Sequence, residues 1–238
     1  MTTSVARPDP DRLTDPRPGR TPLRWAAVAG LGAIAAVLSA LVATPTDVHL
    51  SDGSAAVAAG LAAAAGGMVF ALPLTALFAT LLTTMAALLA WSVPRSAPGG
   101  IALRVGLVAA VLTNALSCVS AVFGGLALHL AAIGADPGLV AGIYTGQFVA
   151  LSACAFPDVA MVAGIGAGLH RARLVPTWVT AVGVVAIVAR LVSVTALATS
   201  GPFALDGPLG LYLPLTFVVW IIALSAVLLR RARSVTEG

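Results

Sequence analysis

The chain has 238 residues, of which 59% are hydrophobic and only 9% are charged, and its mean hydropathy is +1.02. Soluble domains carry about 25% charged residues, so this composition excludes a soluble globular fold and favours lipid as the solvent. The formal net charge of +4 comes from arginine alone, because the chain contains no lysine. The arginines flank apolar segments, which favours a role in membrane topology over nucleic-acid binding.

The chain begins with a polar segment and a first apolar run. Residues 1–22 are rich in proline, arginine and aspartate, which predicts a disordered cytoplasmic tail. Residues 25–43 read WAAVAGLGAIAAVLSALVA. This run is longer than the 7–15 apolar residues typical of a signal peptide, so an uncleaved transmembrane helix is predicted.

The second apolar run, residues 55–91, is longer than one crossing needs at 1.5 Å per residue. Gly66, Gly67 and Pro73 offer a break or a kink. We predict one long helix that crosses the membrane over residues 66–91, with its first turns outside the bilayer or lying at its interface. Two crossings here would put the later arginine-rich loops on the opposite side, and are rejected for that reason.

Four further apolar runs complete the predicted fold. They cover residues 101–133, 139–169, 177–199 and 209–229. The sequence therefore predicts an all-α bundle of six transmembrane helices, with a membrane domain over residues 23–231 and a short cytoplasmic tail over residues 232–238. Small residues recur in every run, and the GIGAG stretch at 164–168 predicts a face of close helix packing.

The loop charges predict the orientation of the bundle. Six crossings place twelve of the thirteen arginines on one side. The charged residues of the opposite loops are all aspartates (Asp47, Asp52, Asp136 and Asp206). The positive-inside rule makes the arginine side the cytoplasm. We therefore predict a plasma-membrane protein with both termini in the cytoplasm.

Two charges fall inside the predicted helices. Asp158 lies about 18 Å, and Arg190 about 21 Å, from the cytoplasmic ends of their helices at 1.5 Å per residue. A short loop joins these two helices, so they are antiparallel neighbours. A charge at this depth usually faces a partner, and an arginine fork fits a carboxylate. We predict an intramembrane ion pair between Asp158 and Arg190.

Other polar residues near this depth extend the candidate site. Pro157 removes a helical hydrogen bond and predicts a kink. Asn114 lies about 20 Å into the third helix, so a polar cluster of Asn114, Asp158 and Arg190 is predicted. Gln147 and Tyr144 lie further out on the fourth helix, where they would line an outward path. The pair either fixes helix register or belongs to a pathway for a small solute or ion.

Several chemistries lack residues to support them. His49, His129 and His170 are predicted at membrane edges on opposite sides, so no metal site is expected. Cys118 and Cys154 are predicted to be small buried side chains without a disulfide. No nucleotide-binding or hydrolase motif appears, and no cofactor is predicted.

Three classes of function remain from these observations. The first is a non-catalytic membrane protein that acts through partner helices or self-association. The second is a small-solute or ion transporter. The third, a lipid-modifying enzyme, needs polar residues that converge at one membrane face, and no such set is present. The first class is preferred.

The C-terminal part carries a resemblance. It rests on the stretches HRARLVPTWVTAVGVVAIVARLVSVTALA and GPLGLYLPLTFVVWIIALSAVLLRRAR, within about residues 168–233, and on the short basic turn RLVPTW near the start of the first stretch. They resemble the last two helices of a bacterial multi-helix membrane family classed as a domain of unknown function. The resemblance implies the same six-helix architecture and carries no activity or catalytic residue.

Overall fold

The structure, a computed structural model, describes residues 20–43, 48–194, 213 and 215–234. Within these ranges the chain is helical and contains no strand. The helices are α1 (Arg20–Ala43), the short 3-10 helix η2 (Leu50–Asp52), α2 (Ser54–Ser92), α3 (Gly100–Ala132), α4 (Pro137–Ala153), α5 (Ala155–Arg171), α6 (Thr177–Val194) and α8 (Leu215–Ser234).

Six stretches of this structure are long and apolar enough to cross a membrane, and α4 with α5 forms one of them. The predicted all-α architecture of six membrane-spanning segments is thereby confirmed. Two boundaries differ: α1 begins at Arg20, inside the predicted tail, and α8 continues to Ser234. Predictions for residues 1–19, 44–47 (with the loop charge Asp47), 195–212, 214 and 235–238 lie outside the described residues.

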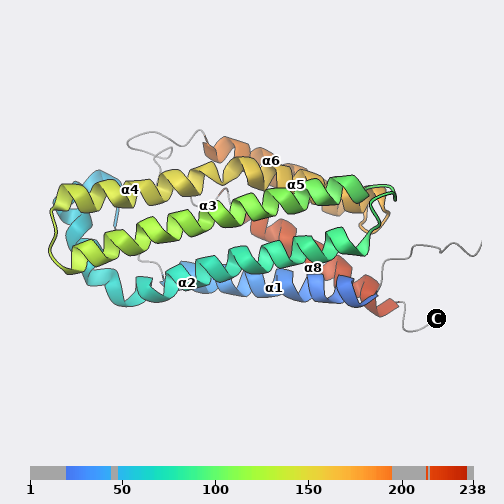
Figure 1. The fold of residues 1–238 in the computed structure, drawn as a ribbon, viewed down its shortest axis with the longest axis horizontal. Coiled ribbons are helices and arrows are strands. Elements are labelled where there is room, and N and C mark those ends of the chain that lie inside the picture. Colours follow the sequence, from blue (N-terminus) through green and yellow to red (C-terminus); the bar gives the residue numbers. More distant parts are fainter. Residues whose placement is uncertain (1–19, 44–47, 195–212, 214, 235–238) are drawn as a thin grey trace, which may run out of the picture.

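The helices pack around a closed ring of neighbours (Figure 1). Going around it, α1 packs against α2, α2 against α3, α3 against α5, α5 against α6 and α6 against α8. Contacts between α8 and α1 close the ring, and α4 lies against α2 and α3. The first and last of the described helices are therefore direct neighbours.

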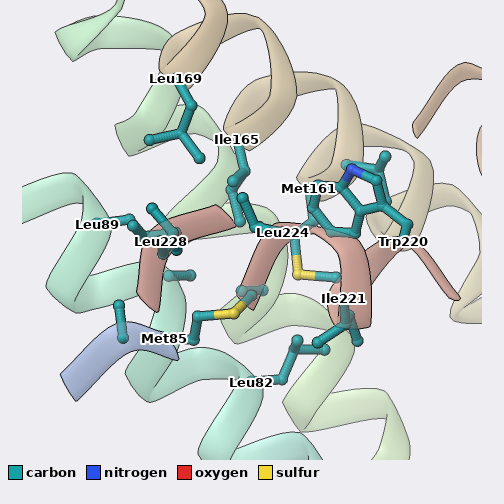
Figure 2. Close-up of a cluster of buried hydrophobic side chains, with 14 of the residues drawn as sticks. Leu82, Met85, Leu89, Met161, Ile165, Leu169, Trp220, Ile221, Leu224 and Leu228 are labelled. Atoms are coloured by element: carbon teal, nitrogen blue, oxygen red, sulfur yellow. The ribbon is translucent and has the colours of Figure 1, made fainter. Parts of the chain in front are cut away.

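Large apolar side chains from α2, α5 and α8 fill the inside of the ring (Figure 2). Trp220 on α8 is fully buried there, and its ring stacks on Phe217 with centroids 5.8 Å apart. Met85 from α2 and Met161 from α5 are also fully buried. Because lipid tails are as apolar as these side chains, this core stabilises the bundle through close packing rather than through transfer from water.

A second, smaller core lies where α2, α3 and α4 meet. Figure 1 shows the first turns of α2, drawn in light blue, curving across the ends of α3 and α4. Val57 and Leu61 on these turns pack with Leu128 and Val140. Helix α2 is one continuous helix that contains Pro73 in its interior, so the residues before the predicted crossing extend the same helix and anchor it on its neighbours.

The helix ends that carry arginine gather at one end of the bundle, at the right of Figure 1. They are the start of α1, the turn from α2 to α3, the turn from α5 to α6 and the end of α8. Three tryptophans near these ends, Trp25, Trp91 and Trp178, are 58%, 86% and 52% exposed. Exposed tryptophan rings at one level are typical of a membrane–water interface.

Glycines bring the backbones of α3 and α5 into contact. A Cβ on Gly164 would lie 2.6 Å from the backbone nitrogen of Gly106 and 2.8 Å from the carbonyl oxygen of Ala102. One turn later, a Cβ on Gly168 would lie 3.0 Å from the carbonyl oxygen of Gly99. A Cβ on Gly166 would meet open space. Two of the three glycines in the predicted packing face therefore make the close approach.

We expect Gly164→Ala to destabilise the protein and Gly166→Ala to leave its stability unchanged or higher. In an unconstrained helix, alanine is favoured over glycine by roughly 1 kcal/mol, so Gly166→Ala should be neutral or stabilising. Gly164→Ala must push two backbones apart, which costs about 1–3 kcal/mol in a well-packed core. Thermal melting of the purified protein in detergent measures both changes, and equal melting temperatures for the two variants would contradict the close crossing.

Candidate functional site

The span made of α4 and α5 is interrupted at Cys154. The backbone N–H of Cys154 donates to the carbonyl of Leu151, three residues back, at 3.2 Å, instead of continuing the regular four-residue pattern. Pro157, one turn later, has no N–H, so the carbonyl of Ala153 loses its helical donor. The helix resumes at Ala155, and Asp158 lies in its first turn.

Arg190 on α6 reaches the interrupted span at Asp158. The Nε atom of Arg190 lies 2.8 Å from Oδ2 of Asp158 and donates a hydrogen bond to it. Both residues are buried, with 8% and 6% of their surfaces exposed. The structure therefore brings together the two charges that the sequence places at similar depths. Removing either one would leave an uncompensated charge inside the bundle.

The same guanidinium also contacts the other side of the interruption. Its Nη2 atom donates to the carbonyl of Leu151 at 3.3 Å. Arg190 thus holds a carboxylate in the first turn of α5 and a carbonyl in the last turn of α4. The carbonyl of Leu151 already accepts from the N–H of Cys154, so the bond from Arg190 is a second one that ties α6 to the end of α4.

Thr113 on α3 completes the surroundings of Asp158. Its hydroxyl donates to Oδ1 of Asp158 at 2.9 Å, and the threonine is 4% exposed. Each carboxylate oxygen therefore has a donor, one from α6 and one from α3. This polar cluster, formed by Thr113, Asp158, Arg190 and the carbonyl of Leu151, joins four helices.

The predicted cluster named Asn114 where the structure uses Thr113. Asn114 is half-buried and accepts a weak hydrogen bond from Cys118 on its own helix, with 3.7 Å between Sγ and Oδ1. Cys118 is exposed on the outside of the bundle, which corrects the prediction that it is buried; Cys154 is buried as predicted. Asn114 and Cys118 share one face of α3, and Thr113 lies on the face turned toward α5.

Gln147 and Tyr144 lie one to two turns further along α4. Tyr144 is buried in the smaller core, where its ring meets Phe148 edge to face with centroids 5.1 Å apart. The backbone carbonyl of Gln147 accepts from the hydroxyl of Ser120 at 3.1 Å. Its side-chain Oε1 packs so tightly against α3 that a Cβ on Gly124 would lie 2.6 Å away. In the structure these residues join α4 to α3.

A pattern in α3 could have identified Thr113. Small residues recur every three or four positions along its buried face: Thr113, Ser117, Ser120 and Gly124. This spacing marks one side of a helix, and that side faces α4 and α5, as the bond from Ser120 to Gln147 and the bond from Thr113 to Asp158 show. Asn114 falls outside the series. The carbonyl of Leu151 gives no such signal, because backbone groups are present at every position.

The cluster is electrically balanced by its own members. One guanidinium and one carboxylate neutralise each other, and a hydroxyl and a carbonyl take up further hydrogen bonds. Among the residues that the structure describes, no group of three or more histidine, cysteine, aspartate or glutamate side chains is placed to hold a metal ion. The geometry is that of a hydrogen-bonded polar contact between helices.

No family model, curated protein or solved structure matches this chain. The resemblance of residues 168–233 to a bacterial membrane family therefore stays a prediction.

We expect Thr113→Val to destabilise the protein and Asn114→Leu, the adjacent control, to leave it nearly unchanged. Valine keeps the shape of threonine but leaves one oxygen of Asp158 without its donor. Hydrogen bonds between membrane helices contribute about 0.6–1.7 kcal/mol, so the melting temperature should fall by roughly 2–6 °C for a protein of this size. Thermal melting in detergent measures both variants. A larger effect from Asn114→Leu would restore the cluster predicted from depth alone.

Proposed function

We propose that this chain is a non-catalytic integral membrane protein that acts through the packing of its helices, with a partner's helices or with a second copy. The observation that carries the proposal is the internal balance of the polar cluster. Asp158 and Arg190 are buried and are bonded to each other, to Thr113 and to Leu151. A solute site needs polar groups left over for the solute, and here both oxygens of the carboxylate are already occupied.

The outer surface of α2 supports an association role. Near its start, small residues at four-residue spacing are all exposed: Ala55, Ala59, Ala63 and Gly67. Such spacing places them on one face of the helix, and small side chains let another helix approach closely. The described part of α2 therefore offers an exposed face of small residues that is suited to helix contact.

The orientation belongs to the same proposal. The arginine end of the bundle faces the cytoplasm, with both termini on that side of the plasma membrane. Support comes from the gathering of arginine-bearing helix ends and exposed tryptophans at one end, and from Asp52 and Asp136 at the starts of α2 and α4.

A transporter is the second candidate, because one observation favours it. The helix break at Cys154 lies beside a charged pair inside the membrane, and discontinuous helices next to charged residues are used by transporters to bind solutes. The two candidates differ in whether water reaches the break.

Cys154 allows this difference to be measured. In a Cys118→Ser variant, Cys154 is the single cysteine, and it is 2% exposed. We expect a charged, water-soluble thiol reagent to modify Cys154 only after denaturation, because its thiol is buried in the packed interface between helices. The variant is placed in liposomes with reagent on both sides, and labelling is followed by mass.

The control adds Ser96→Cys, in the exposed turn between α2 and α3, and should react at once. Rapid modification of Cys154 in the folded protein would mean that water reaches the break, and transport would become the better proposal.

Association is tested by photo-crosslinking in the native membrane. Phe70 on α2 is 69% exposed and can be replaced by benzoylphenylalanine, a photoreactive residue of similar shape. We expect one discrete adduct, either with a second copy or with one partner protein. The same replacement at Phe78, which packs against the main core, should give no adduct between chains. If Phe70 and further exposed positions on every helix yield only lipid adducts, the association proposal fails.

A further inference from the structure

The contact between Gly99 and Gly168 brings two turns of the chain together. Gly99 ends the turn between α2 and α3, and Gly168 lies in the last turn of α5. A Cβ on Gly99 would overlap the carbonyl oxygen of Gly168. Backbone contact at this point places the turn over residues 93–99 beside the turn over residues 172–176.

Four arginines surround this contact, and we call them the arginine patch: Arg95, Arg104, Arg171 and Arg173. Three of them are exposed, and Arg104 is half-buried. The Nη1 atom of Arg104 donates to the carbonyl of Gly100 at 2.8 Å, so its guanidinium is turned back toward the turn. All four positive charges are therefore presented at the same end of α3 and α5.

The described part of the chain offers no carboxylate to this patch. Its acidic residues are Asp52 and Asp136, beside the starts of α2 and α4 at the other end of the bundle, and Asp158, which is bonded to Arg190. Four like charges that repel one another favour an anionic partner from outside the described chain.

Arg173 occupies a backbone conformation in which glycine is usual. Its φ is +55°, and the N–H of the next residue, Leu174, bonds back to the carbonyl of Leu169 at 2.8 Å. Helix α3 ends in the same way, with Gly134 at φ +72° and a bond of 3.0 Å from Ala135 to Leu130. A side chain in this conformation is strained, so the helix end alone would favour glycine at position 173.

Exposed aromatic rings place the patch at the level of lipid headgroups. Trp91 comes shortly before the first turn and is 86% exposed, and Trp178 follows the second turn and is 52% exposed. Tryptophan is enriched where hydrocarbon meets headgroups, because its ring is apolar and its N–H is polar. The guanidinium groups of the patch therefore lie where phosphate groups of the bilayer are found.

We propose that the arginine patch binds the headgroup of an anionic phospholipid from the surrounding bilayer. The planar guanidinium groups match the phosphate oxygens in geometry and charge. The close contact of the two turns joins arginines from α3 and α5 into one binding surface, and the side chain of Arg173 offsets its backbone strain by contacting the lipid.

Phosphatidylglycerol is the probe for this proposal. The full chain, purified in neutral detergent, is titrated with fluorescently labelled phosphatidylglycerol, and binding is followed by anisotropy. Arg171→Gln with Arg173→Gln should raise the apparent Kd about 25-fold, because each arginine near an anionic surface contributes about 1 kcal/mol, or roughly fivefold. The matched control, Arg24→Gln with Arg230→Gln, removes the same charge from α1 and α8 and should change the apparent Kd little.

Three results would overturn the proposal. Equal weakening in the two double variants would show diffuse attraction to the whole arginine end. Equal binding of labelled phosphatidylcholine would show that the anionic headgroup is not recognised. Displacement of the lipid by equimolar inorganic phosphate would assign the patch to a free anion instead.

Arg173→Gly separates lipid binding from folding. Glycine relieves the strained conformation, so the melting temperature without lipid should rise by a few degrees. The apparent Kd for phosphatidylglycerol should nevertheless rise about fivefold, the loss of one arginine contact. A more stable protein with unchanged lipid binding would remove Arg173 from the patch and overturn its proposed role.

Discussion

A single guanidinium holds the interrupted span of this protein to its neighbours. Arg190 donates to a carboxylate on one side of the break at Cys154 and to a carbonyl on the other side. Cys154 keeps a right-handed helical backbone conformation, and the carbonyl of Leu151 already accepts its N–H, so Arg190 adds a bond across the interruption. The buried guanidinium therefore joins the two halves of the interrupted span, and they in turn supply a carboxylate and a carbonyl as its acceptors.

Helix α3 provides the surface on which this arrangement rests. Gly106 lets α5 approach until backbones touch, and two turns further along, the same close approach brings Thr113 within 2.9 Å of Asp158. Beyond the break, Ser120 and Gly124 receive α4 in the same way. One stripe of small residues thus positions both halves of the interrupted span, and the ion pair depends on packing as much as on charge.

The sequence predicts the crossings well because hydropathy and length are local properties. The depth of a residue along its helix can also be calculated from the sequence, since each residue adds 1.5 Å. This calculation places Asp158 and Arg190 at one level. The direction of a side chain around the helix is not given by depth: Thr113 and Asn114 differ by about 100° in direction and by one residue in depth. This is why Asn114 was expected in the cluster that contains Thr113.

Long-range contacts account for the remaining differences. Pro157 predicts a kink from the sequence, but the bond from Arg190 on α6 to the carbonyl of Leu151 joins residues that are far apart in the chain. The first turns of α2 bend across α3 and α4 because Val57 and Leu61 find their partners there. Neither partner is close in sequence, so local patterns predict a helix but not its path.

The contact between α1 and α8 has a consequence for biogenesis. At their crossing, Gly30 faces Ser225 and Ile221, with Met85 of α2 beside them. Among the described helices, α1 is synthesised before α8, so α1 and α2 are made while one flank of the ring is still open. The flank closes only after α8 has been synthesised.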